Sequence, residues 1–368
     1  MNYFFIAIAF LVAVFMGWII TPQILLVAFR KRLFDSVGGR KTHSGIVPRL
    51  GGVVFVPVQC FLLVLSMFFM YKLEITSYLQ DPFIPFQFLL LMIGLLILNM
   101  VGVIDDLIRI NYRRKFVAQI VPFLPLSGLW INDLYGLLGI TTLSPWIGMP
   151  LTVFVAVFII NAVNLIDGID GLCSGLVGMG ALVFGFLFIY NAAWLHAVFA
   201  FITAGVLCPF FYYNVFGKSK GRQRIFMGDT GSLTLGLSMA FLAISYAMNN
   251  PLIKPFSEGA IVVSFATLIV PLFDVVRVVR IRYFQHKPLF MPDQNHIHHK
   301  FLRVGMSHYV AMILILALAL FFSFFNIVAV EYISNNIVIF IDIVLWIAFH
   351  LWLDRRELIR AKHGVANN

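Results

Sequence analysis

Long apolar stretches dominate this chain and restrict the folds that are open to it. A helix that crosses a bilayer needs about 20 mainly apolar residues, and residues 3–29 already supply such a stretch. Of the 368 residues, 61% are hydrophobic and only 11% are charged, which is far from the composition of a soluble domain. The sequence therefore predicts an all-α integral membrane protein, a multi-span helical bundle.

Eleven apolar stretches predict about 11 transmembrane helices. The first has no positive flank before it and the basic cluster RKR after it, so it is a span with the N-terminus outside, not a secretory signal. The eleven stretches are 3–29, 50–71, 87–104, 116–130, 146–160, 172–190, 193–215, 233–248, 260–279, 309–330 and 337–353.

Positive charge supports this topology. If eleven spans alternate from an external N-terminus, 24 of the 26 Lys and Arg residues, all except Lys72 and Lys254, fall on the cytoplasmic side with the C-terminus, as the positive-inside rule expects. The net charge of +10 is thus a topological signal that also suits anionic lipid headgroups or a polyphosphate, and nothing indicates nucleic acid. We predict one domain, 1–368, with active-site loops at 30–49, 105–115, 161–171, 217–231 and 280–307.

Carboxylates at the predicted cytoplasmic span ends are the first indication of chemistry. Ionisable groups at membrane depth are costly and are functional candidates by default, although each could also just end a helix or pair with a loop lysine. The aspartates in question are Asp105, Asp106, Asp167, Asp170, Asp229 and Asp274.

The stretch NAVNLIDGIDG ends the fifth predicted span. Continued as a helix, it places Asn161, Asn164 and Asp167 on one face, and the two glycines favour a break that presents Asp170. Oxygen ligands of this kind suit a hard cation such as Mg²⁺. The alternative is an Asn or Asp cap for the next span.

Two further acidic motifs and a histidine motif complete the pattern. The adjacent Asp105 and Asp106 suit cation coordination or proton abstraction. In GDTGS, Asp229 at a helix start offers a carboxylate beside backbone N–H groups, or is a plain N-cap. In HIHH, the histidines lack the partners of a usual zinc site, so they either donate to phosphates or are solvated loop residues.

In this order the motifs resemble those of the polyprenyl-phosphate N-acetylhexosamine-1-phosphate transferase family, over nearly the whole chain. The matching segments are THSGIVPRLGG, GVIDDLIRI, NAVNLIDGIDG, FMGDTGS, PLFDVVRVVRIR and HIHH. The HIHH form resembles the branch that loads N-acetylglucosamine 1-phosphate, not the branch that loads phospho-MurNAc-pentapeptide.

The resemblance implies a ten- or eleven-span bundle in the bacterial cytoplasmic (inner) membrane with its active site facing the cytoplasm. The implied reaction is Mg²⁺-dependent, with Mn²⁺ as a substitute. It transfers a sugar 1-phosphate from a UDP-N-acetylhexosamine, here UDP-N-acetylglucosamine, to undecaprenyl phosphate, releases UMP and starts a cell-envelope glycan. Membrane lipids are the other partners. Whether the protein forms a homodimer is not decided by the sequence.

The resemblance also implies roles by position. Asp229 would be the principal metal ligand, with Asn161 near the metal, and Asp105 and Asp106 would serve the lipid phosphate. The catalytic residues implied are Asp105, Asp106, Asp229 and His296. The substrate-binding residues implied are Lys115, Asn161, Asn164, Asp167, Asp170, His298, His299 and Arg303.

Some alternatives stay open at this point. Another UDP-N-acetylhexosamine or phospho-MurNAc-pentapeptide fits most of the same motifs as donor. A cation-coupled transporter is a more distant alternative. Transporters place their sites near the bilayer midplane and often have duplicated halves, whereas the polar motifs here lie at predicted cytoplasmic span ends and no duplication is visible. Direct attack, a general base and a covalent aspartyl phosphate are not separated by sequence. The tail after Asp354 gives no functional signal.

Overall fold

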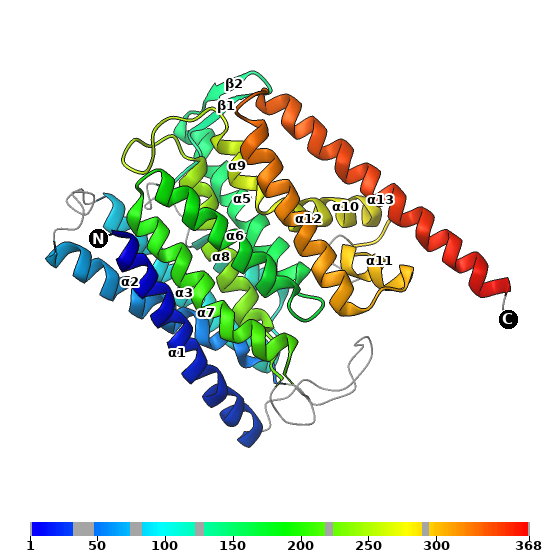
Figure 1. Cartoon of the computed structure of the whole chain (residues 1–368), viewed down its shortest axis with the longest axis horizontal. Helices are drawn as coiled ribbons and strands as arrows, with labels where there is room; N and C mark the ends of the chain where they lie inside the picture. Colours follow the sequence, from blue (N-terminus) through cyan, green and yellow to red (C-terminus); the bar gives the residue numbers. More distant parts are fainter. Residues whose placement is uncertain are drawn as a thin grey trace.

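A computed structural model describes residues 2–31, 48–73, 83–121, 129–217, 224–288 and 294–366. These residues form a helical bundle with one small antiparallel hairpin, in which β1 (Asp133–Leu137) pairs with β2 (Ile140–Thr142) (Figure 1). Within the described ranges, nine helices are long and apolar enough to cross a membrane, and a bent pair adds a tenth. The prediction of an all-α membrane protein is confirmed in this form.

The spanning helices alternate in direction between two ends of the bundle. One end carries the hairpin and is called the hairpin end; the other carries the predicted motifs and is called the site end. The nine helices are α1 (Asn2–Arg30), α2 (Phe55–Lys72, extended by the 3-10 turn η1, Leu50–Val54), α3 (Phe83–Ile108), α5 (Pro145–Ile166), α6 (Leu172–Tyr190), α7 (Trp194–Val215), α8 (Gly228–Ala247), α12 (His308–Ala329) and α13 (Asn335–Ala366).

The predicted span 116–130 is only partly described. Its helix α4 (Tyr112–Ile120) has nine residues, and residues 122–128 lie outside the described residues. Gln119 bonds to Asn161 near the end of α5, and the Ile131 N–H donates to Thr152 Oγ1 nearer its start. The chain therefore runs back along α5 from the site end toward the hairpin end. A total of eleven spans and their orientation stay predictions.

Helix α8 lies at the centre of the bundle and is buried from Thr230 to its end at Ala247. Its sequence GDTGSLTLGLSMA is rich in small residues, which let helices approach closely inside a membrane. A Cβ atom on Gly102 of α3 would lie 2.4 Å from Thr230 Cα, and one on Gly236 would lie 2.7 Å from Ile160 Cα of α5. Close packing thus fixes the start of α8 between α3 and α5.

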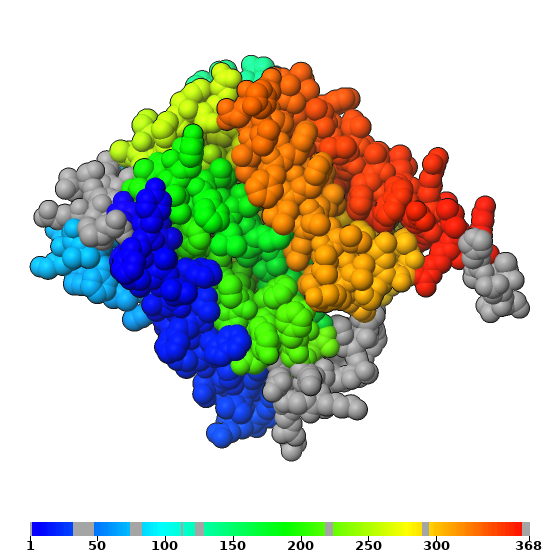
Figure 2. Space-filling model, viewed as in Figure 1, coloured from blue at the N-terminus to red at the C-terminus, as the bar shows by residue number. Residues whose placement is uncertain are grey.

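The predicted span 260–279 is bent and not straight. It consists of α9 (Ala260–Ala266) and α10 (Ile269–Phe284), which meet at an angle of 79°. The short helix α11 (Ile297–Val304) follows at the site end. The last helix, α13, leans away from the bundle, so the C-terminus lies far from the N-terminus (Figures 1 and 2).

Candidate active site

An open cavity of about 1090 Å³ lies at the site end, between the ends of α3 and α5, the start of α8, and α11. We call it the polar cavity. Of the twelve residues to which the resemblance gives a role, ten line it and two, Asn161 and His296, do not. The ten are Asp105, Asp106, Lys115, Asn164, Asp167, Asp170, Asp229, His298, His299 and Arg303.

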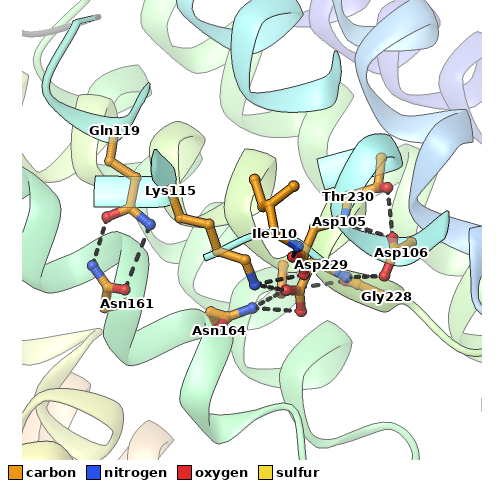
Figure 3. Close-up of polar contacts among 11 residues, drawn as sticks. Asp105, Asp106, Ile110, Lys115, Gln119, Asn161, Asn164, Gly228, Asp229 and Thr230 are labelled. Atoms are coloured by element: carbon orange, nitrogen blue, oxygen red, sulfur yellow. Dashed lines mark hydrogen bonds and ion pairs between the residues drawn. The ribbon is translucent and has the colours of Figure 1, made fainter. Parts of the chain in front are cut away.

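Two carboxylates in the polar cavity share one cation (Figure 3). The Lys115 ammonium lies 2.5 Å from Asp105 Oδ2 and also bonds to Asp229 Oδ2. The other oxygen of Asp105 accepts from the Ile110 N–H at 2.7 Å, and the other oxygen of Asp229 accepts from Asn164 Nδ2 at 3.1 Å. Residues from α3, α4, α5 and α8 therefore converge on a single positive charge.

Asp106 points away from Lys115 and caps the start of α8. Its two oxygens accept hydrogen bonds from the Asp229 N–H (2.9 Å), the Thr230 N–H (3.0 Å) and the Thr230 hydroxyl (2.6 Å). The preceding Gly228 has φ +71°, and a Cβ atom there would lie 2.5 Å from Asp106 Oδ2. The three hydrogen bonds that Asp106 accepts among the described residues all come from the turn that carries Asp229.

The two asparagines of NAVNLIDGIDG have different partners. Asn161 forms a reciprocal pair with Gln119 of α4, in which its Nδ2 donates to Gln119 Oε1 at 2.7 Å. Asn164 reaches Asp229 and donates to Ser232 Oγ at 2.7 Å. Asn164 is thus the amide of the polar cavity, whereas Asn161 lies behind it, and a metal-binding role for Asn161 stays a prediction.

The turn DGIDG breaks the chain between α5 and α6 as the glycines predict. Gly171 has φ +76° and donates its N–H to Asn214 Oδ1 of α7 at 2.6 Å. Asn214 Nδ2 in turn donates to the Ile225 carbonyl at 2.8 Å. Asp170 forms an ion pair with Arg224. One buried asparagine thus joins this turn to the segment that precedes α8.

Asp167 projects into the polar cavity from the end of α5. Partial desolvation in the cavity, followed by the negative charges of Asp229 and Asp106, raises the pKa of Asp167 above the usual range of an aspartate. Its side chain is nevertheless exposed to the cavity. A cation bound nearby would favour its ionised form.

A buried carboxylate on α10 holds the histidine segment. Asp274 is 1% exposed and accepts from His296 Nδ1 (2.9 Å), the Ile297 N–H (3.0 Å) and Arg277 (2.8 Å). His296 is 5% exposed and lies outside the cavity lining. In the structure, His296 therefore starts α11, and its catalytic role stays a prediction.

His298 brings α11 against the DGIDG turn. It is 1% exposed, and a Cβ atom on Gly168 would lie 2.1 Å from its Nε2. Both ring nitrogens have no hydrogen-bond partner among the described residues. Burial, together with neighbouring histidines, lowers its pKa to about 3, so the free protein holds it as a neutral imidazole. An imidazolium at this position is thus not the state of the free protein.

Sequence reasoning missed several residues that support the site. Arg224, Gln119 and Asn214 carried no motif signal, because each acts through a partner more than 40 positions away. Arg49 also lines the cavity. The rest of the predicted loop 30–49 is described only at residues 30, 31 and 48.

The donors present fit a hard divalent cation. Asp105 and Asp229 already converge on the cationic head of Lys115, and Mg²⁺ in phosphate chemistry takes one or two carboxylates and substrate phosphates. In the described ranges, no group of three or more His, Cys, Asp or Glu side chains is arranged to hold a metal. A cation here would thus share its coordination with substrate oxygens.

Comparisons with known proteins identify the family of this chain. The chain matches Glycosyl transferase family 4 over residues 88–247. It is 30% identical over 322 residues to the "Probable undecaprenyl-phosphate N-acetylglucosaminyl 1-phosphate transferase" of Bacillus subtilis (strain 168), with 86% of this chain and 83% of the relative covered.

Two relatives share the name "Undecaprenyl-phosphate alpha-N-acetylglucosaminyl 1-phosphate transferase". The one from Yersinia pestis is 29% identical over 301 residues, with 78% of this chain and 74% of the relative covered. The one from Escherichia coli (strain K12) is 27% identical over 357 residues, with 93% and 90% covered. The chain therefore belongs to glycosyl transferase family 4, among the membrane-bound sugar-1-phosphate transferases that act on a polyprenyl phosphate.

Proposed function

We propose that this protein transfers N-acetylglucosamine 1-phosphate from UDP-N-acetylglucosamine to undecaprenyl phosphate. The products would be undecaprenyl-diphosphate-N-acetylglucosamine, which starts a cell-envelope glycan, and UMP. The observation that carries the proposal is the convergence of Asp105 and Asp229 on Lys115, inside an open cavity at one end of a membrane bundle.

Charge is the reason this arrangement suits phosphoryl transfer. The reaction joins two polyanions, so it depends mainly on positioning and on neutralisation of charge. The cavity lining has five aspartates and four basic residues, Arg49, Arg109, Lys115 and Arg303, so it has no excess of positive charge to neutralise a diphosphate. We therefore propose that Asp229 and Asp105 hold Mg²⁺, or Mn²⁺ in its place, which would neutralise the phosphates. Lys115 would then be free to bind a phosphate oxygen.

The remaining cavity residues divide into two groups in this proposal. Asp170, with Arg224, would receive the nucleotide on the side of the DGIDG turn. His298, His299 and Arg303 on α11 would lie against the sugar and diphosphate from the opposite wall. Asp106 would act by positioning Asp229 and not as a base, since its oxygens already accept three hydrogen bonds.

Basic residues at the site end support a cytoplasmic orientation of that end. Arg30, Arg49 and Arg109 lie there, and the positive-inside rule favours the cytoplasmic side for such residues. We propose that the protein lies in the bacterial inner membrane with the polar cavity open to the cytoplasm, where UDP-sugars are available. Undecaprenyl phosphate would reach the cavity from the bilayer.

The decisive experiment is transfer of labelled sugar phosphate by the purified protein. UDP-N-acetylglucosamine and undecaprenyl phosphate are incubated with and without Mg²⁺, using wild type, Asp229→Asn and the matched control Glu258→Gln, an exposed carboxylate near the hairpin end. We expect lipid-linked product and UMP that need Mg²⁺, are lost in Asp229→Asn and persist in the control.

Donor and class are tested in the same assay. No activity with UDP-N-acetylglucosamine, together with activity with a different UDP-N-acetylhexosamine or with phospho-MurNAc-pentapeptide as the transferred group, would refute the sugar assignment and keep the class. If folded wild type transfers from no donor, the enzyme proposal is wrong and uptake assays for a cation-coupled transporter come next.

A further inference from the structure

The C-terminal end of α13 lies against α11, the helix that carries His298 and His299 to the polar cavity. Helix α13 has 32 residues, which corresponds to about 48 Å at 1.5 Å per residue. A hydrocarbon core is about 30 Å thick, so the last turns of α13 extend past the membrane at the site end. Sequence alone gave this tail no function.

Two ion pairs join the helices in a single register. Lys300 bonds to Asp354, and Arg303 Nε lies 2.7 Å from Glu357 Oε1. Both pairs have a sequence separation of 54, so the two helices run parallel here. Residues three apart lie on one helix face. Asp354 therefore faces Lys300 while Glu357 faces Arg303, and the two pairs form in the same register of the helices.

Apolar and steric contacts reinforce the same register. Phe301 is 1% exposed, and its ring centroid lies 6.0 Å from that of Phe349 on α13. Gly305, with φ +99°, ends α11, and the guanidinium of the exposed Arg360 on α13 lies over it. The contact with α11 therefore extends along α13 from Phe349 to Arg360.

These contacts bear directly on the cavity. Arg303 lines the polar cavity, and its second bond goes to the Gln294 carbonyl at 2.8 Å. At about 100° per residue, His298 lies on the side of α11 opposite to Lys300, and it packs on Gly168. Helix α11 is thus held between the DGIDG turn on one side and α13 on the other, with Asp274 fixing its start.

We propose that Asp354 and Glu357 are positioning residues of the transferase: they hold α11 at the wall of the polar cavity and thereby set its affinity for the donor sugar nucleotide. The inference rests on the proposed function. Neither carboxylate lines the cavity, so they act through Lys300 and Arg303 and not on the substrate. Their removal should change binding more than the chemical step.

The test uses variants on α13 that leave the cavity residues unchanged. Asp354→Asn and Glu357→Gln are made singly and together, and Arg355→Gln, which removes one charge from an exposed neighbour on the same helix, is the matched control. A reciprocal exchange, Lys300→Asp with Asp354→Lys, restores one pair with reversed charges. KM and kcat for UDP-N-acetylglucosamine are measured, together with hydrogen–deuterium exchange of α11.

We expect the paired removal to raise KM about fivefold and to speed amide exchange in α11 by a similar factor, with little change in kcat, because partly exposed ion pairs couple weakly. The charge-reversed double variant, Lys300→Asp with Asp354→Lys, should have a KM and amide exchange rates closer to wild type than either of its single variants. The positioning role is wrong if the removal variants have the same KM and the same amide exchange rates in α11 as Arg355→Gln. It is also wrong if the charge-reversed double variant recovers neither quantity.

The two proposals fail in different ways. Wild type that transfers no sugar phosphate overturns the proposed function. Hydrogen–deuterium exchange in α11 is measured without turnover. Exchange rates that stay unchanged in the removal variants therefore overturn the positioning role, even when the transferase is fully active.

Discussion

The cap that Asp106 forms on α8 makes a prediction that separates positioning from catalysis. We consider Asp106→Asn, which keeps the shape of the side chain and replaces one acceptor oxygen by an NH₂ group. If the amide oxygen keeps its bonds to Thr230, the NH₂ group faces the Asp229 N–H at the position where an acceptor now lies 2.9 Å away. One backbone donor at the start of α8 then has no partner.

The cost follows from the groups involved. An unsatisfied, largely buried donor costs about 1–3 kcal/mol, and loss of a negative charge at a helix N-terminus costs about 0.5 kcal/mol more. We therefore expect the free energy of unfolding to fall by about 2–3 kcal/mol. Thr230→Val removes only the 2.6 Å hydroxyl bond and keeps both backbone bonds, so it should cost about 1 kcal/mol.

Hydrogen–deuterium exchange of residues 227–231 in detergent measures this locally, alongside transferase activity. Asp106→Asn should accelerate exchange there by at least tenfold, since tenfold corresponds to about 1.4 kcal/mol, and should lower activity because Asp229 loses its position. Thr230→Val should show a smaller change of both. Wild-type exchange in Asp106→Asn combined with loss of activity would refute the cap and make Asp106 a direct participant in the reaction.

Three further predictions concern the cavity. Saturating Mg²⁺ should raise the melting temperature of wild type, because a ligand at about 100 times its Kd stabilises by about 2.7 kcal/mol; Asp229→Asn should lose this shift in a thermal melt. Gly168→Ala should abolish transfer while the chain still folds, since the new methyl group would lie 2.1 Å from His298 Nε2; wild-type kinetics would contradict the packing. The pKa of His298 is lowered to about 3 in the fold from about 6.5 when unfolded, so the unfolded chain binds the extra proton and the free energy of unfolding falls as the pH falls, by about 1.6 kcal/mol from pH 6.5 to 5. Denaturant unfolding at both pH values should show a smaller loss in His298→Gln, and an equal loss would contradict a buried neutral imidazole.

Much of the architecture was predictable, because the tendency of a segment to span the membrane depends on the hydrophobicity of that segment alone. Segments of about 20 apolar residues have few alternatives to a spanning helix, and nine predicted spans correspond to long helices in the described residues, with a tenth, 260–279, as the bent pair α9 and α10. The break at Gly171 was also predictable, because glycine permits the positive φ that the turn adopts. The bend between α9 and α10 also has a local mark, because Pro271 lacks the N–H that would bond to the Thr267 carbonyl at the break.

The residues that line the cavity were likewise predictable. Ionisable side chains near the ends of spans are rare, so those present are functional candidates. Ten of the twelve predicted residues line one cavity. Their individual partners were not predictable: Asn161 and Asn164 lie one helical turn apart, yet one pairs with Gln119 and the other reaches Asp229. Which neighbour each meets depends on how α4 and α8 pack against α5.

The sequence by itself determined that this is a helical membrane protein and which side chains gather in the polar cavity, because hydrophobic length and isolated charge are properties of the chain. Only the tertiary structure decided the pairing of Lys115 with two carboxylates, the capping role of Asp106, and the contact of the α13 tail with α11. Each joins residues from separate helices, and such contacts depend on helix packing, which no local pattern of residues encodes.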